Sequence, residues 1–185
     1  MNEFSTYEYV IPQKIEGKWI FAKAGLLTLY ISLAIAALLI GIKTALLAPL
    51  VALVPVGLWV LIFCTWRYTN VEYEYSITSG ELTFCKIYGN RSRHRILTLD
   101  LRRAARIAPV DNGEHSARAA AFRPELSYSG ISGKEAKDVY YILFETGNKK
   151  EKQKRAILYL EVTQRALQIC RFYNAPVTVL TEVSK

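Results

Sequence analysis

Hydrophobic and polar positions divide the chain into two regions of different kinds. Residues 24–42 form 19 consecutive positions without a charge, and residues 44–66 form 23 more, with only Lys43 between them. As helices rising 1.5 Å per residue, these runs would be about 28 and 34 Å long, close to the roughly 30 Å hydrocarbon core of a bilayer. The short connection predicts a transmembrane helical hairpin at residues 24–66, which follows an N-terminal segment of residues 1–23.

A signal peptide and a buried core helix are the alternatives to two membrane spans. A secretory n-region is short and basic, whereas the segment before the first run is 23 residues long and carries Glu3, Glu8 and Glu16. Neither run has the polar stripe at helical spacing that a core helix usually shows. Two spans are therefore the preferred interpretation. Because neither span contains an ionisable Asp, Glu, Lys, Arg or His, the hairpin is predicted to be an anchor and not a transport path.

Basic residues indicate the orientation of this hairpin. Lys14, Lys18 and Lys23 precede the first run and Arg67 closes the second, while the turn holds only Lys43. The positive-inside bias then places both termini in the cytoplasm and makes the chain a multi-pass protein of the cell membrane. Aromatic residues gather at the same ends of the runs, as an interfacial belt would: Trp19, Phe21, Trp59, Phe63, Trp66 and Tyr68.

From residue 70 onward the pattern changes to that of strands. Residues 71–78 alternate apolar with polar side chains, Ser79-Gly80 supplies a turn, and residues 82–87 begin the return strand. Gly89-Asn90 makes a second turn, and residues 96–101 and 104–110 are predicted as the third and fourth strands. If the third strand begins earlier, its three alternating arginines share one face: Arg91, Arg93 and Arg95.

The second half of this region is less regular before strands return. Residues 111–138 form a long polar stretch with a predicted helical turn at 117–122 and a short strand at 125–129; we expect such a loop to be either functional or mobile. Residues 139–146 and 156–162 are predicted strands, joined by a lysine-rich loop. Residues 163–173 then predict an amphipathic helix with Thr163 as its N-cap and an apolar face of Ala166, Leu167, Cys170 and Tyr173.

This order of elements predicts an α+β chain: a two-helix transmembrane hairpin followed by a pleckstrin-homology-like antiparallel β-barrel or sandwich that is capped by a C-terminal helix. We assign this cytoplasmic domain to residues 67–176 and a C-terminal tail to residues 177–185. Five residues on apolar phases of their strands are predicted to lie in its core: Ile77, Leu82, Leu99, Leu143 and Leu158.

Two stretches of sequence carry a family resemblance. "EYEYSITSGELTFCKI", an arginine-rich turn and "LTLDLRRAARIAPV" resemble the first four strands of a family of uncharacterised two-helix membrane proteins of Gram-positive bacteria. Proteins of that family carry a bacterial pleckstrin-homology-like domain directly after the membrane hairpin. The resemblance implies the same fold and topology, and it implies no catalytic residues.

Signals for an enzyme are poor. Cys64, Cys85 and Cys170 lack metal-ligand spacing, and no phosphate-binding loop, serine elbow or catalytic carboxylate pair is present. A nucleophile set could be drawn from Cys85, His94 and Asp100, but strand periodicity gives no reason for these three to converge, and His115 is the only other histidine. The sequence therefore predicts a non-enzyme without metal or cofactor.

Charge suggests what the predicted domain binds. Residues 67–185 contain 20 Lys and Arg against 13 Asp and Glu, so they carry +7 of the chain's +8. A basic domain held at the cytoplasmic leaflet is attracted to anionic lipid headgroups, although the same charges serve equally well as a solubilising surface. Nucleic acid is not expected, since no motif for it is present.

Two functions remain open. The first is a membrane-anchored module that docks anionic lipid headgroups or an acidic protein partner; the second is a structural or accessory subunit of a membrane protein complex, with no ligand of its own. The predicted binding residues lie in two basic loops: Arg91, Arg93, Arg95, Lys149, Lys150, Lys152, Lys154 and Arg155.

Overall fold

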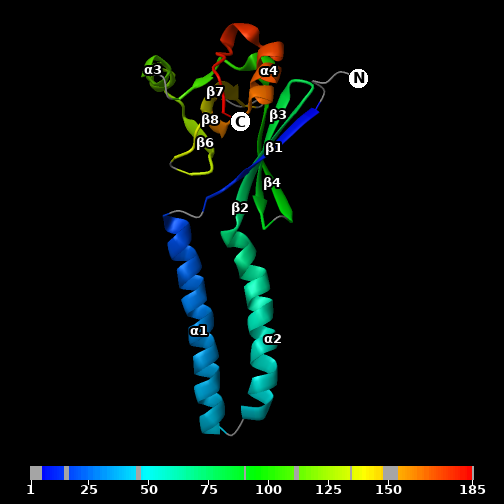
Figure 1. Cartoon of the computed structure of the whole chain (residues 1–185), viewed down its shortest axis with the longest axis vertical. Coiled ribbons are helices and arrows are strands. Elements are labelled where there is room, and N and C mark those ends of the chain that lie inside the picture. Colours follow the sequence, from blue (N-terminus) through cyan, green and yellow to red (C-terminus); the bar gives the residue numbers. More distant parts are fainter. Residues whose placement is uncertain are drawn as a thin grey trace. The chain divides into compact units, whose positions relative to one another are not determined.

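The computed structural model describes residues 6–14, 17–44, 47–89, 91–110, 113–133, 135–147 and 154–184. The chain forms two compact units, which are treated separately below: a helical unit of Lys14–Val71 and Tyr88–Ser92, and a sheet unit made of the remaining segments. The helices and strands, shown in Figure 1, are β1 (Thr6–Pro12), α1 (Lys18–Thr44), α2 (Leu47–Trp66), β2 (Val71–Thr78), β3 (Glu81–Tyr88), β4 (Ser92–Asp100), β5 (Arg106–Pro109), α3 (Gly113–Ala121), β6 (Leu126–Gly130), β7 (Val139–Thr146), β8 (Lys154–Glu161) and α4 (Gln164–Tyr173). Three short 3-10 helices complete the set: η1 (Arg67–Thr69), η2 (Leu101–Arg103) and η3 (Ala175–Val177).

The helical unit is an antiparallel pair of apolar helices (Figure 1), as the sequence predicts. The hydroxyls of Tyr30 on α1 and Thr65 on α2 are hydrogen-bonded to each other at 2.5 Å, and Tyr30 is buried between the helices. Most other large apolar side chains of the pair are exposed, with Phe21 on α1 reaching 79% and Leu53 on α2 reaching 67%. The helices are therefore not buried by the described part of the chain.

The first sheet contains a strand that the sequence analysis does not predict. β1 pairs with β2 in antiparallel register, from Thr6↔Thr78 to Pro12↔Glu72, so the sheet order is β1-β2-β3-β4. Alternation places Ile11 in the core and leaves Val10 on the outer face. The helical hairpin is therefore inserted in sequence between two paired strands, and the sheet unit begins before α1.

The second sheet has the order β5-β7-β8-β6, with β7 and β8 antiparallel and β6 parallel to β8. A break at η2 separates it from β4, because the Asp100 carboxylate accepts a hydrogen bond of 3.0 Å from the Arg102 backbone N–H and turns the chain. The predicted α+β sandwich is confirmed. The alternative of a closed barrel is not, since the strands form two separate sheets.

The main core joins residues of both sheets to α4, which caps it as predicted. Thr163 is the N-cap of α4, and its hydroxyl accepts a hydrogen bond of 3.2 Å from the Ala166 backbone N–H. Leu167, Ile169 and Cys170 on this helix are buried. All five predicted core residues are also buried: Ile77, Leu82, Leu99, Leu143 and Leu158.

A second, smaller core contains part of the segment of residues 111–138. Leu143 lies there with Tyr141, because β7 is buried on both faces, and Ala119 of α3 packs against them. The predicted helical turn is thus part of the longer α3, and the predicted short strand is β6, displaced by one residue. In the part of the segment that the structure describes, both elements are structural parts of the fold.

Residues after α4 also pack on the sheet unit. The Val179 backbone N–H donates to the Ile107 carbonyl at 2.9 Å, Thr181 and Tyr140 are hydrogen-bonded through their hydroxyls, and the Ser184 side chain donates to the Asp138 carboxylate. The segment that we predicted as a tail from residue 177 is therefore attached to the sandwich through residue 184.

Candidate functional site

One face of α2 and its 3-10 extension η1 lines a pocket of about 300 Å³ in the helical unit. Residues three or four apart lie on the same side of a helix, and the six residues of this face follow that spacing: Trp59, Ile62, Phe63, Trp66, Arg67 and Asn70. The first four are apolar or aromatic and the last two are polar. The lining of the pocket therefore changes along the helix, from apolar and aromatic side chains at one end to polar side chains at the other.

The β3–β4 turn supplies the opposite wall, with Gly89 and Arg91. The Gly89 backbone N–H donates to the Asn70 carbonyl at 2.8 Å, and Gly89 has a φ of +56°, which glycine adopts without strain. A Cβ at this position would lie 2.7 Å from the Cβ of Arg67. Only a glycine allows the turn to approach α2 this closely.

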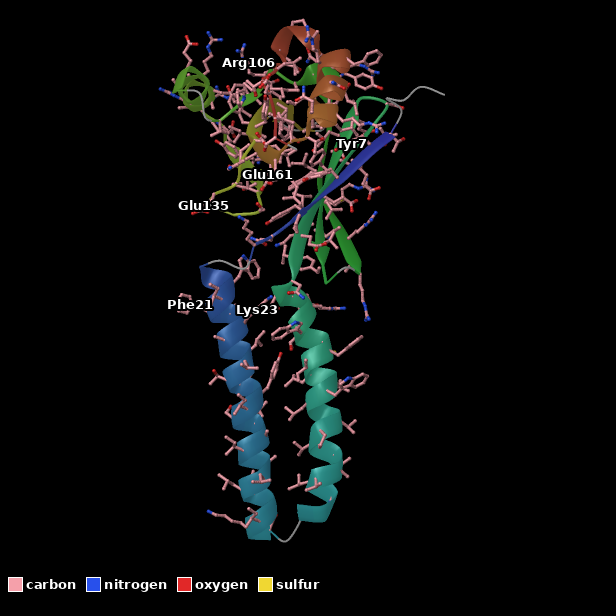
Figure 2. The ribbon with its side chains drawn as sticks, viewed as in Figure 1. Tyr7, Phe21, Lys23, Arg106, Glu135 and Glu161 are labelled. Atoms are coloured by element: carbon pink, nitrogen blue, oxygen red, sulfur yellow. The ribbon has the colours of Figure 1, made fainter. Side chains whose placement is uncertain are left out.

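Three basic side chains gather at the polar end of the pocket. The Arg91 guanidinium lies 4.8 Å from the centre of the Phe63 ring. Arg67 donates to the Tyr68 hydroxyl at 2.7 Å, and Lys23, labelled in Figure 2 in the first turns of α1, donates to the Asn70 side-chain oxygen at 2.9 Å. Within the described part of the chain, no carboxylate lies at ion-pair distance from Arg67 or Arg91.

This arrangement is suited to holding an anion. Guanidinium groups remain protonated at physiological pH and present several N–H donors in one plane, which matches the oxygens of phosphate or carboxylate. Among the described residues, the pocket lining consists of apolar, aromatic, amide and guanidinium side chains together with Gly89.

The predicted basic residues that the structure describes lie in different elements. β4 begins at Ser92, so Arg93 and Arg95 lie on the strand while Arg91 stays in the turn at the pocket. On β8, Lys154 is exposed, and the Arg155 guanidinium lies 5.8 Å from the Phe122 ring centre. The other three predicted residues lie outside the described residues: Lys149, Lys150 and Lys152.

Arg93 has a structural partner in the sheet unit. Its guanidinium lies 3.1 Å from the carboxylate of Glu74 on β2 and 3.2 Å from that of Glu8 on β1. Glu74 is only 4% exposed, and its burial, followed by the nearby charge of Glu8, raises the pKa of its carboxyl although Arg93 opposes that shift. Arg93 therefore compensates the charge of a buried carboxylate.

Cys85 lies in the same charged cluster. Burial raises the pKa of its thiol, Glu74 raises it further, and Arg95 and Arg93 lower it. His94 lies between these arginines on β4, and strand alternation directs it to the other face. The possible set of Cys85, His94 and Asp100 thus gains no support, and the side chain of His115 lies outside the described residues. No metal-binding group of three His, Cys, Asp or Glu occurs in the described part of the chain.

The comparison with known families agrees with this architecture. A family profile described as "Bacterial PH-like domain (DUF6106)" matches residues 4–177. The chain belongs to this family. No curated protein and no solved structure matches the chain. The matched region of this bacterial PH-like domain protein starts before β1 and ends after α4, so it includes the inserted helical hairpin.

Two basic residues were missed as site residues, Arg67 in the lining of the pocket and Lys23 beside it. Arg67 and Lys23 contributed to the predicted orientation of the bacterial PH-like domain protein, but not to its predicted binding residues. A usable signal was present, because Trp59, Phe63, Trp66 and Arg67 follow helical spacing up to the end of the second apolar run. The approach of the Gly89 turn has no such signal, since it depends on how the hairpin of β3 and β4 packs.

Proposed function

We propose that this chain is a membrane-anchored, non-enzymatic binding module that engages anionic lipid headgroups at the cytoplasmic face of the cell membrane. The observation that carries the proposal is the pocket in which Arg67 and Arg91 lie beside the aromatic residues Trp59 and Trp66. Tryptophan is enriched at the level of the lipid headgroups. Arginines at this depth that have no carboxylate at ion-pair distance among the described residues would meet the negative surface potential of the cytoplasmic leaflet.

Length, composition and exposure support two membrane spans. The two candidate spans comprise 26 and 21 residues, and 11% and 0% of their most apolar windows are buried. Water would be in contact with nearly all of this apolar surface if the chain were soluble, at a cost of about 25 cal/mol per Å². A bilayer removes that cost, and helices satisfy their backbone polar groups internally.

Strand pairing supports placing the N-terminal strand and the sheet unit on the same side. β1 precedes the first span and β2 follows the second, yet the two strands are hydrogen-bonded along their length. Paired strands cannot lie on opposite sides of a bilayer. Lys14, Lys23 and Arg67 flank the spans on the side of β1 and β2, so the positive-inside bias favours the cytoplasm for that side.

Cysteines introduced at exposed positions test this topology in intact cells, with the buried Cys170 retained. With Cys64 and Cys85 changed to Ser, Thr44→Cys at the end of α1 is expected to react with a membrane-impermeant maleimide from outside, and Glu81→Cys at the start of β3 only after permeabilisation. Both positions are exposed. External labelling of Glu81→Cys would refute the proposed topology.

Lipid composition tests the binding. The full chain, extracted from vesicles of equal phosphatidylcholine and phosphatidylglycerol with a mild detergent, is expected to retain more phosphatidylglycerol than the bulk. That enrichment should decline as salt rises, since screening acts over about 8 Å at physiological ionic strength. Equal retention of both lipids would refute lipid binding and leave an acidic partner, or an accessory subunit in a membrane complex, as the remaining functions.

A further inference from the structure

We propose that the Arg67–Arg91 pocket is a discrete site for the phosphate group of one anionic glycerophospholipid. This inference rests on the proposed membrane-anchored function and goes further, because it assigns a stoichiometric site in place of general attraction to a charged surface. The two arginines line the same pocket from different segments, one after α2 and the other in the β3–β4 turn.

The two arginines are held in place and keep free donors. Arg91 is stacked on Phe63, and Arg67 lies 4.8 Å from the Tyr68 ring centre while it donates one hydrogen bond to the Tyr68 hydroxyl. A guanidinium has five N–H donors. Most of these remain for the oxygens of a phosphate, which arginine recognises through paired hydrogen bonds.

The remaining lining indicates a lipid as the source of the phosphate. Below the arginines, the pocket wall consists of Trp66, Phe63, Ile62 and Trp59, and Trp59 lies seven residues, or about 10 Å along the helix, from Trp66. Trp59 and Phe63 stack at 5.9 Å between ring centres and are both exposed. An apolar strip that continues along a membrane helix suits a glycerol backbone and acyl chains. A free phosphate ion would gain nothing from it.

Pocket size agrees with a headgroup and not with a whole lipid. A volume of about 300 Å³ lies at the lower end of small-molecule sites. It can enclose a phosphate with its glycerol while the acyl chains remain in the bilayer along α2. Lys23, at 5.6 Å from the Trp66 ring centre, adds a third positive charge beside the site.

A substitution of Gly89 provides a separate test of the same site. A methyl group at this position would lie 2.7 Å from the Arg67 Cβ and 3.1 Å from its Cα, so Gly89→Ala must displace the turn that carries Arg91. We expect Gly89→Ala to weaken lipid binding although it removes no charge. A purely electrostatic surface would not respond to this change.

Native mass spectrometry of the full chain in mild detergent tests the site. Titration with dioleoylphosphatidylglycerol is expected to fill one site per chain with higher affinity than dioleoylphosphatidylcholine. Arg91→Gln and Arg67→Gln should each lower the affinity at least tenfold, and Arg91→Lys should lower it less. The matched control is Arg103→Gln, which removes the same charge from an exposed position on η2 and should change the affinity less than twofold.

Each other outcome overturns the inference in a distinguishable way. Equal losses for Arg91→Gln and Arg103→Gln would show a diffuse charge effect, which removes the discrete site but leaves the proposed function. Equal affinity of the parent chain for the two lipids would refute both the discrete site and the proposed function. Saturation by glycerol 3-phosphate or inorganic phosphate at the affinity of the lipid would show a soluble ligand. Unchanged labelling of the buried Cys170 confirms that the sheet unit of each variant is folded, and unchanged tryptophan fluorescence confirms the same for the helical unit.

Discussion

Changing Ile11 to Ala tests whether the strand before the helical hairpin belongs to the core that follows it. Ile11 is 1% exposed and packs in the main cluster. Ile→Ala removes three carbons, worth about 2.4 kcal/mol at roughly 0.8 kcal/mol each, and large-to-small changes of this kind cost about 2 to 5 kcal/mol. Because β1 is an edge strand that can relax, we expect a loss of about 2 to 3 kcal/mol.

Cys170 provides a reporter for this measurement in the sheet unit. The three tryptophans belong to the helical unit, so their fluorescence does not follow the sheets. Cys170 is 3% exposed in the main core. In the full chain with Cys64 and Cys85 changed to Ser, its alkylation across a urea gradient follows global opening. A loss of 2 to 3 kcal/mol corresponds to labelling about 25- to 150-fold faster, since 1.4 kcal/mol is a factor of ten.

Val10 supplies the matched control. It precedes Ile11 on the same strand but lies on the outer face and is 39% exposed. Val10→Ala should change stability by no more than about 0.5 kcal/mol. If Ile11→Ala and Val10→Ala label Cys170 at the same rate as the parent, β1 does not complete the core, and the interpretation of an inserted hairpin is wrong.

Three further outcomes follow from the sheet unit. Burial raises the pKa of the Cys170 thiol to about 12, whereas the thiol of the unfolded chain titrates near 8.5. The free energy of unfolding should therefore be at its full value below pH 8.5 and fall by about 1 kcal/mol from pH 8.5 to 9.5. Urea titrations of Cys170→Ala should show little of this decrease. Gly130→Ala should lower the free energy of unfolding by about 1 to 3 kcal/mol, since its methyl carbon would lie 2.6 Å from a buried phenylalanine ring. The control is Gly113→Ala, whose methyl carbon would have no atom within 4 Å, and it should not lower the urea midpoint. Arg93→Gln should lower the free energy of unfolding by about 1 to 3 kcal/mol at pH 7.5, because it leaves the Glu74 carboxylate buried without its cation. Adding Glu74→Gln to this variant should restore stability. A double variant that is no more stable than Arg93→Gln would contradict this account.

Elements with strong periodicity could be predicted from the sequence. The two apolar helices, the strands from residue 71 and the capped terminal helix each carry a local signal, and Thr163 was identified as an N-cap from residue type alone. β1 also alternates, with Tyr7, Tyr9 and Ile11 on the core face. It was missed because its partner follows the hairpin, and nothing local to a seven-residue strand identifies a neighbour that far along the chain.

The site was predicted only in part because charge alone does not show which cations are free. Arg91, Arg93 and Arg95 are equivalent in sequence, yet the first lines a pocket and the second neutralises Glu74. The difference depends on where β4 begins and on a glutamate from β2. Sequence periodicity could have added Arg67, since it follows the aromatic face of α2, but the glycine turn that closes the pocket is a tertiary feature.

Insertion of the hairpin between β1 and β2 links membrane topology to the fold of the sheet unit. The strands pair from Thr6↔Thr78 to Pro12↔Glu72, so even their closest partners are 60 positions apart, from residue 12 to residue 72. Contacts of such long range form late, after the intervening chain is arranged. If the hairpin spans the membrane, β1 can join the sheet only when both helices have crossed and returned the chain to the same side. Burial of Ile11 then stabilises that topology. A hairpin inserted with its ends on opposite sides would leave β2 as an open sheet edge with which other chains could pair.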